Sequence, residues 1–285
     1  MKVLITGAQG MLGADLLRAF AKADVVDVPR TLLDITQAKA VSALIHKERP
    51  DVIINAAAYT NVDGCETHID DAYRVNAIGA RNLAIAAQEV GAAVVHFSTD
   101  YVFSGDTPEP RREFDPVAPT SVYGKSKLAG EQLVQALCPR HYIIRTSWLY
   151  GPHGKNFVST MLQLGEKNGT VRVVDDQIGS PTCTVDLAHA VEHLVATSYY
   201  GVYHLSNSGT CSWHQFAIDI FQATGMDVTV EAISSDMLDR PAKRPSYSVL
   251  DNQMWRLSGF APLRSYKEAL QDYIQEYKSQ SGGAL

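Results

Sequence analysis

The sequence has few cysteines, and none of them stands in a pair. Cys65, Cys138, Cys183 and Cys211 lie far apart, and no CxxC spacing occurs. Scattered cysteines of this kind argue against a disulfide framework and against a zinc site made of thiolates. We therefore expect four free, buried thiols and no metal site.

Long hydrophobic runs and an excess of positive charge are also missing. No apolar stretch approaches the roughly 18 residues of a membrane-spanning helix, and the opening MKVLITGAQG reaches glycine and polar residues too early for a signal peptide. The net charge is −6, which argues against general binding to nucleic acids or anionic membranes. We expect a cytoplasmic protein that acts on a small molecule.

Strands and helices alternate through the first half of the chain. An apolar run at 3–6 leads through a glycine-rich turn into an amphipathic helix. Further strands are predicted at 24–29, 51–59, 92–99 and 141–151, with helices at 36–50, at 71–91 and after a proline-rich loop at 106–119. Apolar strands that alternate with helices predict an α/β fold with a doubly wound parallel sheet.

The pattern is less regular after residue 151. Short strands are predicted at VRVVDDQ, GVYHLSN and VTVEAI, and helices at 184–198, 212–224 and 265–278. We expect residues 1–150 to form a dinucleotide-binding domain. Residues 151–285 are then mainly a smaller α/β substrate domain, with some segments returning to the sheet.

The glycine-rich turn carries the first functional signal. Gly7, Gly10 and Gly13 form GxxGxxG between a strand and a helix, where glycine lets a pyrophosphate approach the backbone and the helix N-terminus. Such turns also occur for packing alone, but the strand-to-helix context favours dinucleotide binding.

The choice between NAD and NADP stays open at this level. Asp27 lies at the distance expected for a carboxylate that binds the adenosine ribose, which favours NAD. Arg30 is placed to pair with the additional phosphate of NADP. Asp34 is a candidate for contact with adenine, or for a partner at a helix N-terminus.

Tyr123 and Lys127 lie one turn apart on the helix that Thr120 or Ser121 begins. Tyrosine is a neutral acid at pH 7, and a lysine charge beside it lowers the energy needed to ionise it. Ser98 and Thr99, at the end of a predicted strand, offer a hydroxyl for a substrate carbonyl. A surface tyrosine and a strand-end threonine are the simpler alternative, but the glycine loop favours catalysis.

Several motifs resemble those of the dTDP-4-dehydrorhamnose reductases, which are extended short-chain dehydrogenases. These motifs are GAQGMLG, LDIT, NAAAYTNVD, VNAIGARNLA, STDYVFSG, YGKSKLAGE, RTSWLYG and KNFV, spread over nearly the whole chain. The resemblance implies a Rossmann sheet with a small C-terminal domain. It also implies reduction of the 4-keto group of dTDP-4-dehydro-6-deoxy-L-mannose to dTDP-L-rhamnose with NADPH or NADH.

The resemblance also implies roles for individual residues, with Thr99 preferred over Ser98. The catalytic residues it implies are Thr99, Tyr123 and Lys127. The cofactor is expected to contact Tyr123 and Lys127 as well. Its other expected contacts are Gly7, Gln9, Gly10, Met11, Leu12, Arg30, Asp34, Ile35, Ala56, Ala57, Ala58, Tyr59 and Asn76. The dTDP-sugar is expected to contact Val62, Thr99, Asp100, Tyr101, Trp148, Asn156 and Arg240. Some relatives hold a metal between subunits, but no metal ligands transfer clearly to this chain. A homodimer is allowed.

Three further segments have two interpretations each. Arg240 and Arg244 suit a nucleotide diphosphate, or are surface charges in a loop. Thr182 and Asp186 are as readily structural as functional. The pattern HxxEH at 189–193 is found in zinc proteases, but its position beside an apolar helix stripe favours an exposed helix face.

The residue after Asp100 separates reduction from dehydration. Related dehydratases have Thr-Asp-Glu at this position, whereas this chain has Thr99, Asp100 and Tyr101. Without the glutamate, elimination has no base, and net reduction is expected. An epimerase or a non-catalytic regulatory subunit on the same fold are the alternatives, and the intact Thr99, Tyr123 and Lys127 argue against the regulatory subunit.

Overall fold

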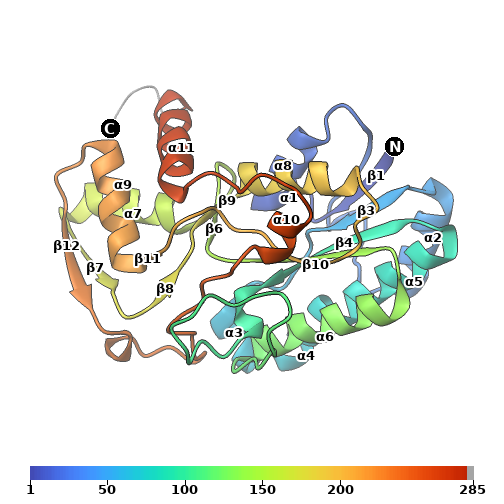
Figure 1. Ribbon diagram of the computed structural model, residues 1–285, viewed down its shortest axis with the longest axis horizontal. Coiled ribbons are helices and arrows are strands. Elements are labelled where there is room, and N and C mark those ends of the chain that lie inside the picture. Colours follow the sequence, from blue (N-terminus) through green and yellow to red (C-terminus); the bar gives the residue numbers. More distant parts are fainter. Residues whose placement is uncertain (281–285) are drawn as a thin grey trace.

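The centre of the molecule is a six-stranded sheet in which every strand runs parallel to its neighbours. The computed structural model describes residues 1–280 (Figure 1). The strand order is β10-β5-β4-β3-β1-β2. The strands are β1 Lys2–Thr6, β2 Asp24–Val28, β3 Val52–Asn55, β4 Ala93–Thr99, β5 His141–Thr146 and β10 Gly201–His204. The order reverses beside β1, where β2 lies on one side and β3 on the other, and ligands of such sheets bind there.

Helices cover both faces of this sheet, so the predicted doubly wound, Rossmann-like fold is confirmed. Val3 and Ile5 pack in one hydrophobic core and Leu4 in the other, because successive strand residues point to opposite faces. The first core is covered by α1 Met11–Ala19, α8 Thr184–Val195 and α10 Gln253–Leu257. The second is covered by α2 Ala38–Glu48, α5 Ala80–Val90 and α6 Val122–Leu137.

The C-terminal part lies beside the sheet and has its own hydrophobic core (Figure 1). Its helices are α7 Phe157–Asn168, α9 Trp213–Thr224 and α11 Tyr266–Gln280. Its strands are β6 Leu149–Tyr150, β7 Thr170–Val174, β8 Ile178–Gly179, β9 Thr182–Cys183, β11 Cys211–Ser212 and β12 Thr229–Ile233. One segment after residue 150 returns to the six-stranded sheet, since β10 pairs with β5. The division near residue 150 stays a prediction.

Short helices complete the fold next to the carboxyl ends of the strands. They are α3 Val62–Thr67, α4 Ile69–Tyr73, the π-helix η1 Arg74–Gly79, and the 3₁₀ helices η2 Asp100–Val102 and η3 Ser235–Met237. The predicted helix at 71–91 is therefore three segments, α4, η1 and α5, in continuous succession. A single π-helical turn of this kind is often found at functional sites.

Two predicted strands were too long. The strand predicted at 51–59 ends at Asn55, where the side chain accepts a hydrogen bond from the Thr6 hydroxyl and another from the Ala57 N–H. Those bonds turn the chain out of the sheet. The strand predicted at 141–151 is divided by Trp148, whose φ of 49° is not a strand conformation.

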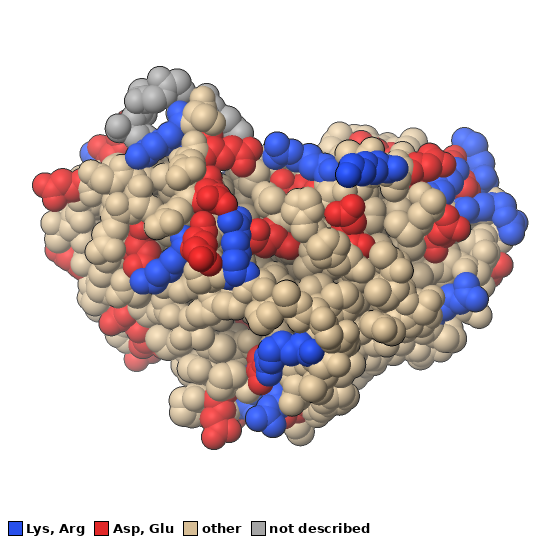
Figure 2. Space-filling view, turned by 45° about the horizontal axis from the view of Figure 1, so that its top comes forward, with Lys and Arg blue, Asp and Glu red and all other residues tan. Residues whose placement is uncertain are grey.

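Charges of both signs are interspersed on the face that Figure 2 shows. Within residues 1–280, no helix is both long and apolar enough to cross a membrane. All four cysteines are buried and free, as expected.

Candidate active site

The glycine loop lies where the sheet reverses its strand order. Gly7 has φ of +69°, and a Cβ there would lie 2.6 Å from the Ala57 nitrogen. A Cβ on Gly13 would lie 2.2 Å from the Gly7 oxygen, so the loop and α1 pack without room for a side chain. Gly10 precedes the first residue of α1, which gives the loop a helix N-terminus suited to phosphate.

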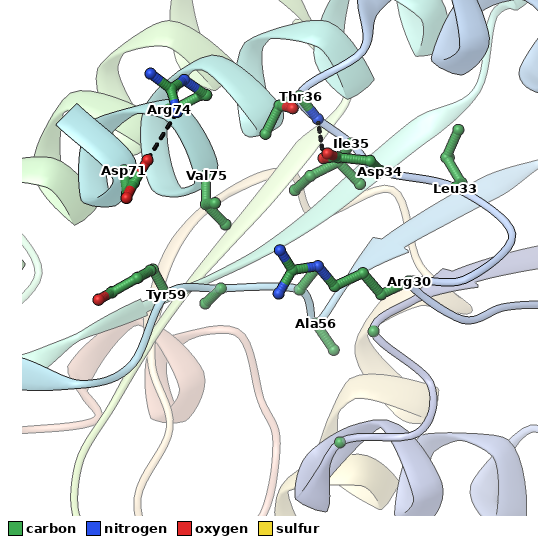
Figure 3. A pocket seen from close by; sticks show the side chains of 14 residues that line it. Arg30, Leu33, Asp34, Ile35, Thr36, Ala56, Tyr59, Asp71, Arg74 and Val75 are labelled. Carbon is green, nitrogen blue, oxygen red and sulfur yellow. Dashed lines mark hydrogen bonds and ion pairs between the residues drawn. The ribbon is translucent and has the colours of Figure 1, made fainter. Parts of the chain in front are cut away.

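A cavity of about 420 Å³ extends from this loop (Figure 3). Of the expected cofactor residues, the cavity is lined by Gly7, Gly10, Arg30, Asp34, Ile35, Ala56, Ala57, Ala58 and Tyr59. Figure 3 shows the Arg30 side chain reaching across it toward Tyr59 and Ala56. Asp27 is exposed and does not line this cavity. Asp34 accepts a hydrogen bond from the Thr36 N–H at 2.9 Å, so its carboxylate ties its own loop and does not cap α2.

Arg74 is a lining residue that the sequence interpretation missed. Its guanidinium binds Asp71 at 2.7 Å on the opposite wall from Arg30. Arg30, by contrast, has no ion-pair partner within residues 1–280. A guanidinium left without a carboxylate in a cofactor-sized cavity suits a phosphate group.

A second cavity, of about 520 Å³, adjoins the first, because Gly10, Ala56 and Ala58 line both. Thr99 reaches it from the end of β4, and Tyr123 and Lys127 reach it from α6. The structure thus brings together the three residues expected to be catalytic. We call this second cavity the catalytic cavity. Others of the expected residues that line it are Met11, Leu12, Val62, Asp100, Tyr101 and Trp148.

The start of α6 fixes the Tyr123 and Lys127 pair. The Ser121 side chain accepts a hydrogen bond from the Gly124 N–H at 3.2 Å, which makes Ser121 the N-cap, one of the two predicted. A Cβ on Gly124 would lie 2.2 Å from the Tyr101 oxygen, so this turn of α6 lies directly against η2. That contact sets α6 against the end of β4.

Burial dominates the electrostatics of the pair. It lowers the pKa of Lys127 to about 8, against a smaller opposing effect of Glu131. Burial also raises the pKa of the Tyr123 phenol, and a hydrogen bond with Thr99 works in the other direction. The carboxylate of Glu131 is bound on both oxygens by Arg145, at 2.9 and 2.7 Å, which limits its pairing with Lys127. Tyr123 is therefore a neutral acid at pH 7 and Lys127 largely a cation.

Thr99 is tied to its neighbours through its hydroxyl. The Oγ1 donates to Asp100 Oδ1 at 2.9 Å and accepts from the Tyr101 N–H at 3.2 Å. The buried Ser98 hydroxyl, the alternative to Thr99, has no hydrogen-bond partner within residues 1–280, although it lines the same cavity. Thr99 lowers the pKa of Tyr123, against the larger effect of burial, and this influence favours Thr99 of the two.

Four of the expected contact residues do not line either cavity. Gln9 is exposed in the glycine loop. Asn76, in η1, accepts from the Tyr59 N–H at 2.8 Å and donates to the Tyr59 oxygen at 3.1 Å, so it holds a cavity wall from behind. Asn156 caps α7, with its amide bonded to Ser159 and Gly151.

Arg240 is the fourth of these, and it lies beside Arg244 in the loop that precedes α10. The Arg244 guanidinium binds both oxygens of Asp63, at 3.0 and 2.8 Å, and is therefore already paired with α3. Tyr101 is in reach of Arg244 as well. Both arginines lie near the catalytic cavity without lining it.

Trp213 and Lys155 line the catalytic cavity but were missed in the sequence. The indole of Trp213 stacks on that of Trp148, with ring centroids 3.5 Å apart. No spacing in the sequence connects these two tryptophans, so their contact is visible only in the folded chain. The helix predicted at 212–224 is α9, but its proximity to the site was not predicted.

The remaining candidates line neither of the two cavities. Asp186 binds Arg264 at 2.9 Å and accepts from Asn207 at 2.7 Å, which joins α8 to the segment before α11. Thr182 is buried in β9. His189 contacts Glu192 at 3.4 Å on the exposed side of α8, and residues 1–280 contain no group of three or more His, Cys, Asp or Glu placed to hold a metal ion.

A doubly wound sheet with a glycine loop at its reversal point, and a Tyr-Lys pair on α6 beside the end of β4, defines the class of extended short-chain dehydrogenases. The family model for the RmlD substrate binding domain matches residues 1–279, and the chain belongs to this family.

Relatives with similar sequences and structures agree with this assignment. A dTDP-4-dehydrorhamnose reductase of Streptomyces griseus is 44% identical, over 94% of this chain and 91% of the relative. A dTDP-4-keto-6-deoxy-D-glucose reductase of Streptomyces niveus is 41% identical, over 94% of each. The crystal structure of a dTDP-4-dehydrorhamnose reductase of Bacillus anthracis in complex with NADP has a TM-score of 0.95 and 47% identity, over 96% of this chain and 99% of that one.

Proposed function

We propose that this protein reduces the 4-keto group of dTDP-4-dehydro-6-deoxy-L-mannose to give dTDP-L-rhamnose. The observation that carries the proposal is the joining of a cofactor-sized cavity to a second cavity lined by Thr99, Tyr123 and Lys127. The family supports it, since dTDP-4-dehydrorhamnose reductases are among its members.

NADPH is the proposed cofactor, with NADH as an alternative. The glycine loop leaves no room for side chains at Gly7 and Gly13, which suits the close approach of a pyrophosphate. Arg30 has no ion-pair partner within residues 1–280 and reaches into the cavity that extends from the glycine loop, where it suits the additional phosphate of NADPH. When bound, the reduced nicotinamide supplies the hydride for the substrate carbon.

The chain's own residues then handle the proton and the charge. Tyr123 donates its phenolic proton to the substrate oxygen as negative charge develops there. Lys127 stabilises the resulting phenolate by its positive charge, in a buried site where that charge acts strongly. Thr99 orients the substrate oxygen and Tyr123, since its hydroxyl lies in hydrogen-bond reach of the phenol.

Net reduction is favoured over dehydration by the residue that follows Asp100. Tyr101 occupies the position where related dehydratases have a glutamate, and its ring packs edge-to-face on Tyr123 at 5.5 Å. Burial raises the pKa of Tyr101, so its phenol stays protonated at pH 7 and cannot take a proton from the carbon beside the carbonyl. Hydride addition and protonation by Tyr123 need no such base.

The test is incubation of the purified protein with the dTDP-4-keto sugar and each reduced cofactor, with identification of the product. We expect one NAD(P)H oxidised per sugar and free exchange of the cofactor. Conversion without loss of NAD(P)H absorbance would identify an epimerase. Reduction of dTDP-4-keto-6-deoxy-D-glucose alone would assign the sugar of the Streptomyces niveus relative instead.

We also propose a cytoplasmic location. The four cysteines are free and buried, which is consistent with a reducing compartment. A homodimer stays a prediction, and size-exclusion chromatography with light scattering tests it.

A further inference from the structure

The indole of Trp148 is held in an unusual way at the catalytic cavity. Trp148 follows β5, and its φ of 49° is in the left-handed region, which is disfavoured for a residue with a side chain. One ring face is covered by Trp213, with an interplanar angle of 7° and centroids 3.5 Å apart. Trp213 is in turn packed on Phe157, whose centroid is 4.6 Å away.

The other ring face of Trp148 lies against Gly179. A Cβ on Gly179 would lie 2.3 Å from Cε2 of Trp148 and 2.6 Å from both Cζ2 and Nε1. If this Cβ position lay in the plane of the ring, outside its rim, it would be closer to Nε1 and Cζ2 than to Cε2, which lies between them. The point is therefore above the ring, and because Trp213 fills one face, Gly179 covers the opposite one.

An indole covered on both faces offers only its rim to a ligand. Trp148 lines the catalytic cavity, and its N–H has no acceptor within residues 1–280. The third tryptophan differs, since the N–H of Trp255 donates to the Ala261 oxygen at 2.7 Å. A free indole N–H at the cavity suits a hydroxyl or phosphate oxygen.

We propose that Trp213 and Gly179 are positioning residues, which clamp the Trp148 indole so that it meets the sugar nucleotide with its rim and its N–H rather than with a ring face. The inference rests on the proposed function for the identity of the ligand. It makes α9 of the C-terminal part responsible for substrate affinity, although Trp213 lies far from Trp148 in the sequence. A ring-face stack on the sugar would require Trp213 to leave its place.

The experiment compares Trp213→Leu, Trp148→Phe and the double variant, with Trp255→Phe as the matched control. We expect Trp213→Leu to raise KM for the dTDP-4-keto sugar roughly tenfold, a loss of about 1.4 kcal/mol, with a smaller change in kcat and unchanged NADPH affinity. Trp148→Phe keeps an aromatic ring but removes the N–H, so it should raise KM similarly. The double variant should be no worse than Trp148→Phe, because Trp213 acts through Trp148.

Two further variants separate positioning from folding. Trp213→Phe retains an aromatic face and should restore most of the affinity. Gly179→Ala pushes the indole from the other side and should raise KM as Trp213→Leu does. The proposal would be overturned if Trp213→Leu raised KM by the same factor in the unaltered protein and in the Trp148→Phe variant. It would also be overturned if Trp213→Leu left KM unchanged.

A spectroscopic signature tests the geometry without turnover. Two stacked indoles give an exciton couplet in circular dichroism, which Trp148→Phe and Trp213→Leu should abolish and Trp255→Phe should preserve. Its absence from the unaltered protein overturns the inference. Absence of sugar conversion by the unaltered protein, with the couplet present, would instead contradict the proposed function.

Discussion

The hydroxyl of Thr99 donates a hydrogen bond to Oδ1 of Asp100, its neighbour in the sequence, at 2.9 Å. The second oxygen of Asp100 is buried without a hydrogen-bond partner among residues 1–280. Burial is the largest influence on this carboxyl and raises its pKa to about 6, while the hydrogen bond from Thr99 opposes the shift. A residue expected only to contact the sugar is therefore also a carboxyl with a raised pKa beside Thr99, the threonine proposed to be catalytic.

We predict that Asp100 makes the protein less stable as the pH rises from about 4 to about 6. In that range the native carboxyl keeps its proton while the unfolded one loses it, so the unfolded state binds fewer protons and the free energy of unfolding falls. The shift corresponds to on the order of 3 kcal/mol at most. Urea denaturation at several pH values measures it. Asp100→Asn should flatten the slope in this range, and an unchanged slope would show that other groups cause it.

Tyr123→Phe should lower turnover by roughly 10²–10⁴-fold, since it removes the general acid and keeps the ring. Cofactor affinity should stay nearly unchanged. Stopped-flow measurement of hydride transfer and a separate NADPH titration test the two statements. Near-normal turnover by Tyr123→Phe would remove this residue from the mechanism.

Local sequence patterns were enough to predict the main elements of the site. GxxGxxG after an apolar run predicts the turn at Gly7, because only glycine tolerates its positive φ and the nearby Ala57. Thr120 or Ser121 before an amphipathic stretch predicts the start of α6, and with it the shared face of Tyr123 and Lys127. These features depend on residues within a few positions of one another.

Contacts between distant segments could not be predicted in this way. Asn156 was expected near the sugar, but its side-chain oxygen caps α7 by accepting from the Ser159 N–H, and its NH2 group donates to the Gly151 oxygen. Trp213 joins the site only because α9 packs beside β8 and the loop after β5. The expected roles of individual residues remain proposals for the same reason, since they depend on a bound ligand.

Arg30→Ala should weaken NADPH binding more than NADH binding. The unpaired guanidinium is proposed to meet the additional phosphate, and a charged hydrogen bond of this kind contributes about 1.5–3 kcal/mol. Isothermal titration with both cofactors measures the difference. Arg74→Ala is the matched control, because Arg74 lines the same cavity but is paired with Asp71. An equal loss for both cofactors would show that Arg30 does not bind the phosphate.

Lys127→Met should reduce both turnover and cofactor affinity, since the ammonium is expected to act on the Tyr123 phenolate and on the nicotinamide ribose. The unaltered enzyme should lose activity as the pH rises through about 8, because burial lowers the pKa of Lys127 to that value and the neutral amine no longer stabilises the phenolate. The pH dependence of kcat/KM tests this. A profile that stays level well above pH 8 would show that the charge is not needed.

Gly7→Ala should abolish cofactor binding, whereas Gly91→Ala should not, although both glycines have similar positive φ values of +69° and +76°. The shared backbone strain is roughly 1–2 kcal/mol. At Gly91 nothing lies within 4 Å of a new Cβ, so strain is the whole effect and the free energy of unfolding should fall by about that amount. At Gly7 the Cβ would also lie 2.6 Å from the Ala57 backbone nitrogen, which must move and carry the cavity wall with it.

Thermal unfolding and NADPH titration of both variants separate the two effects. Normal NADPH binding by Gly7→Ala would show that the close packing of the loop on the segment after β3 is not required for the cofactor.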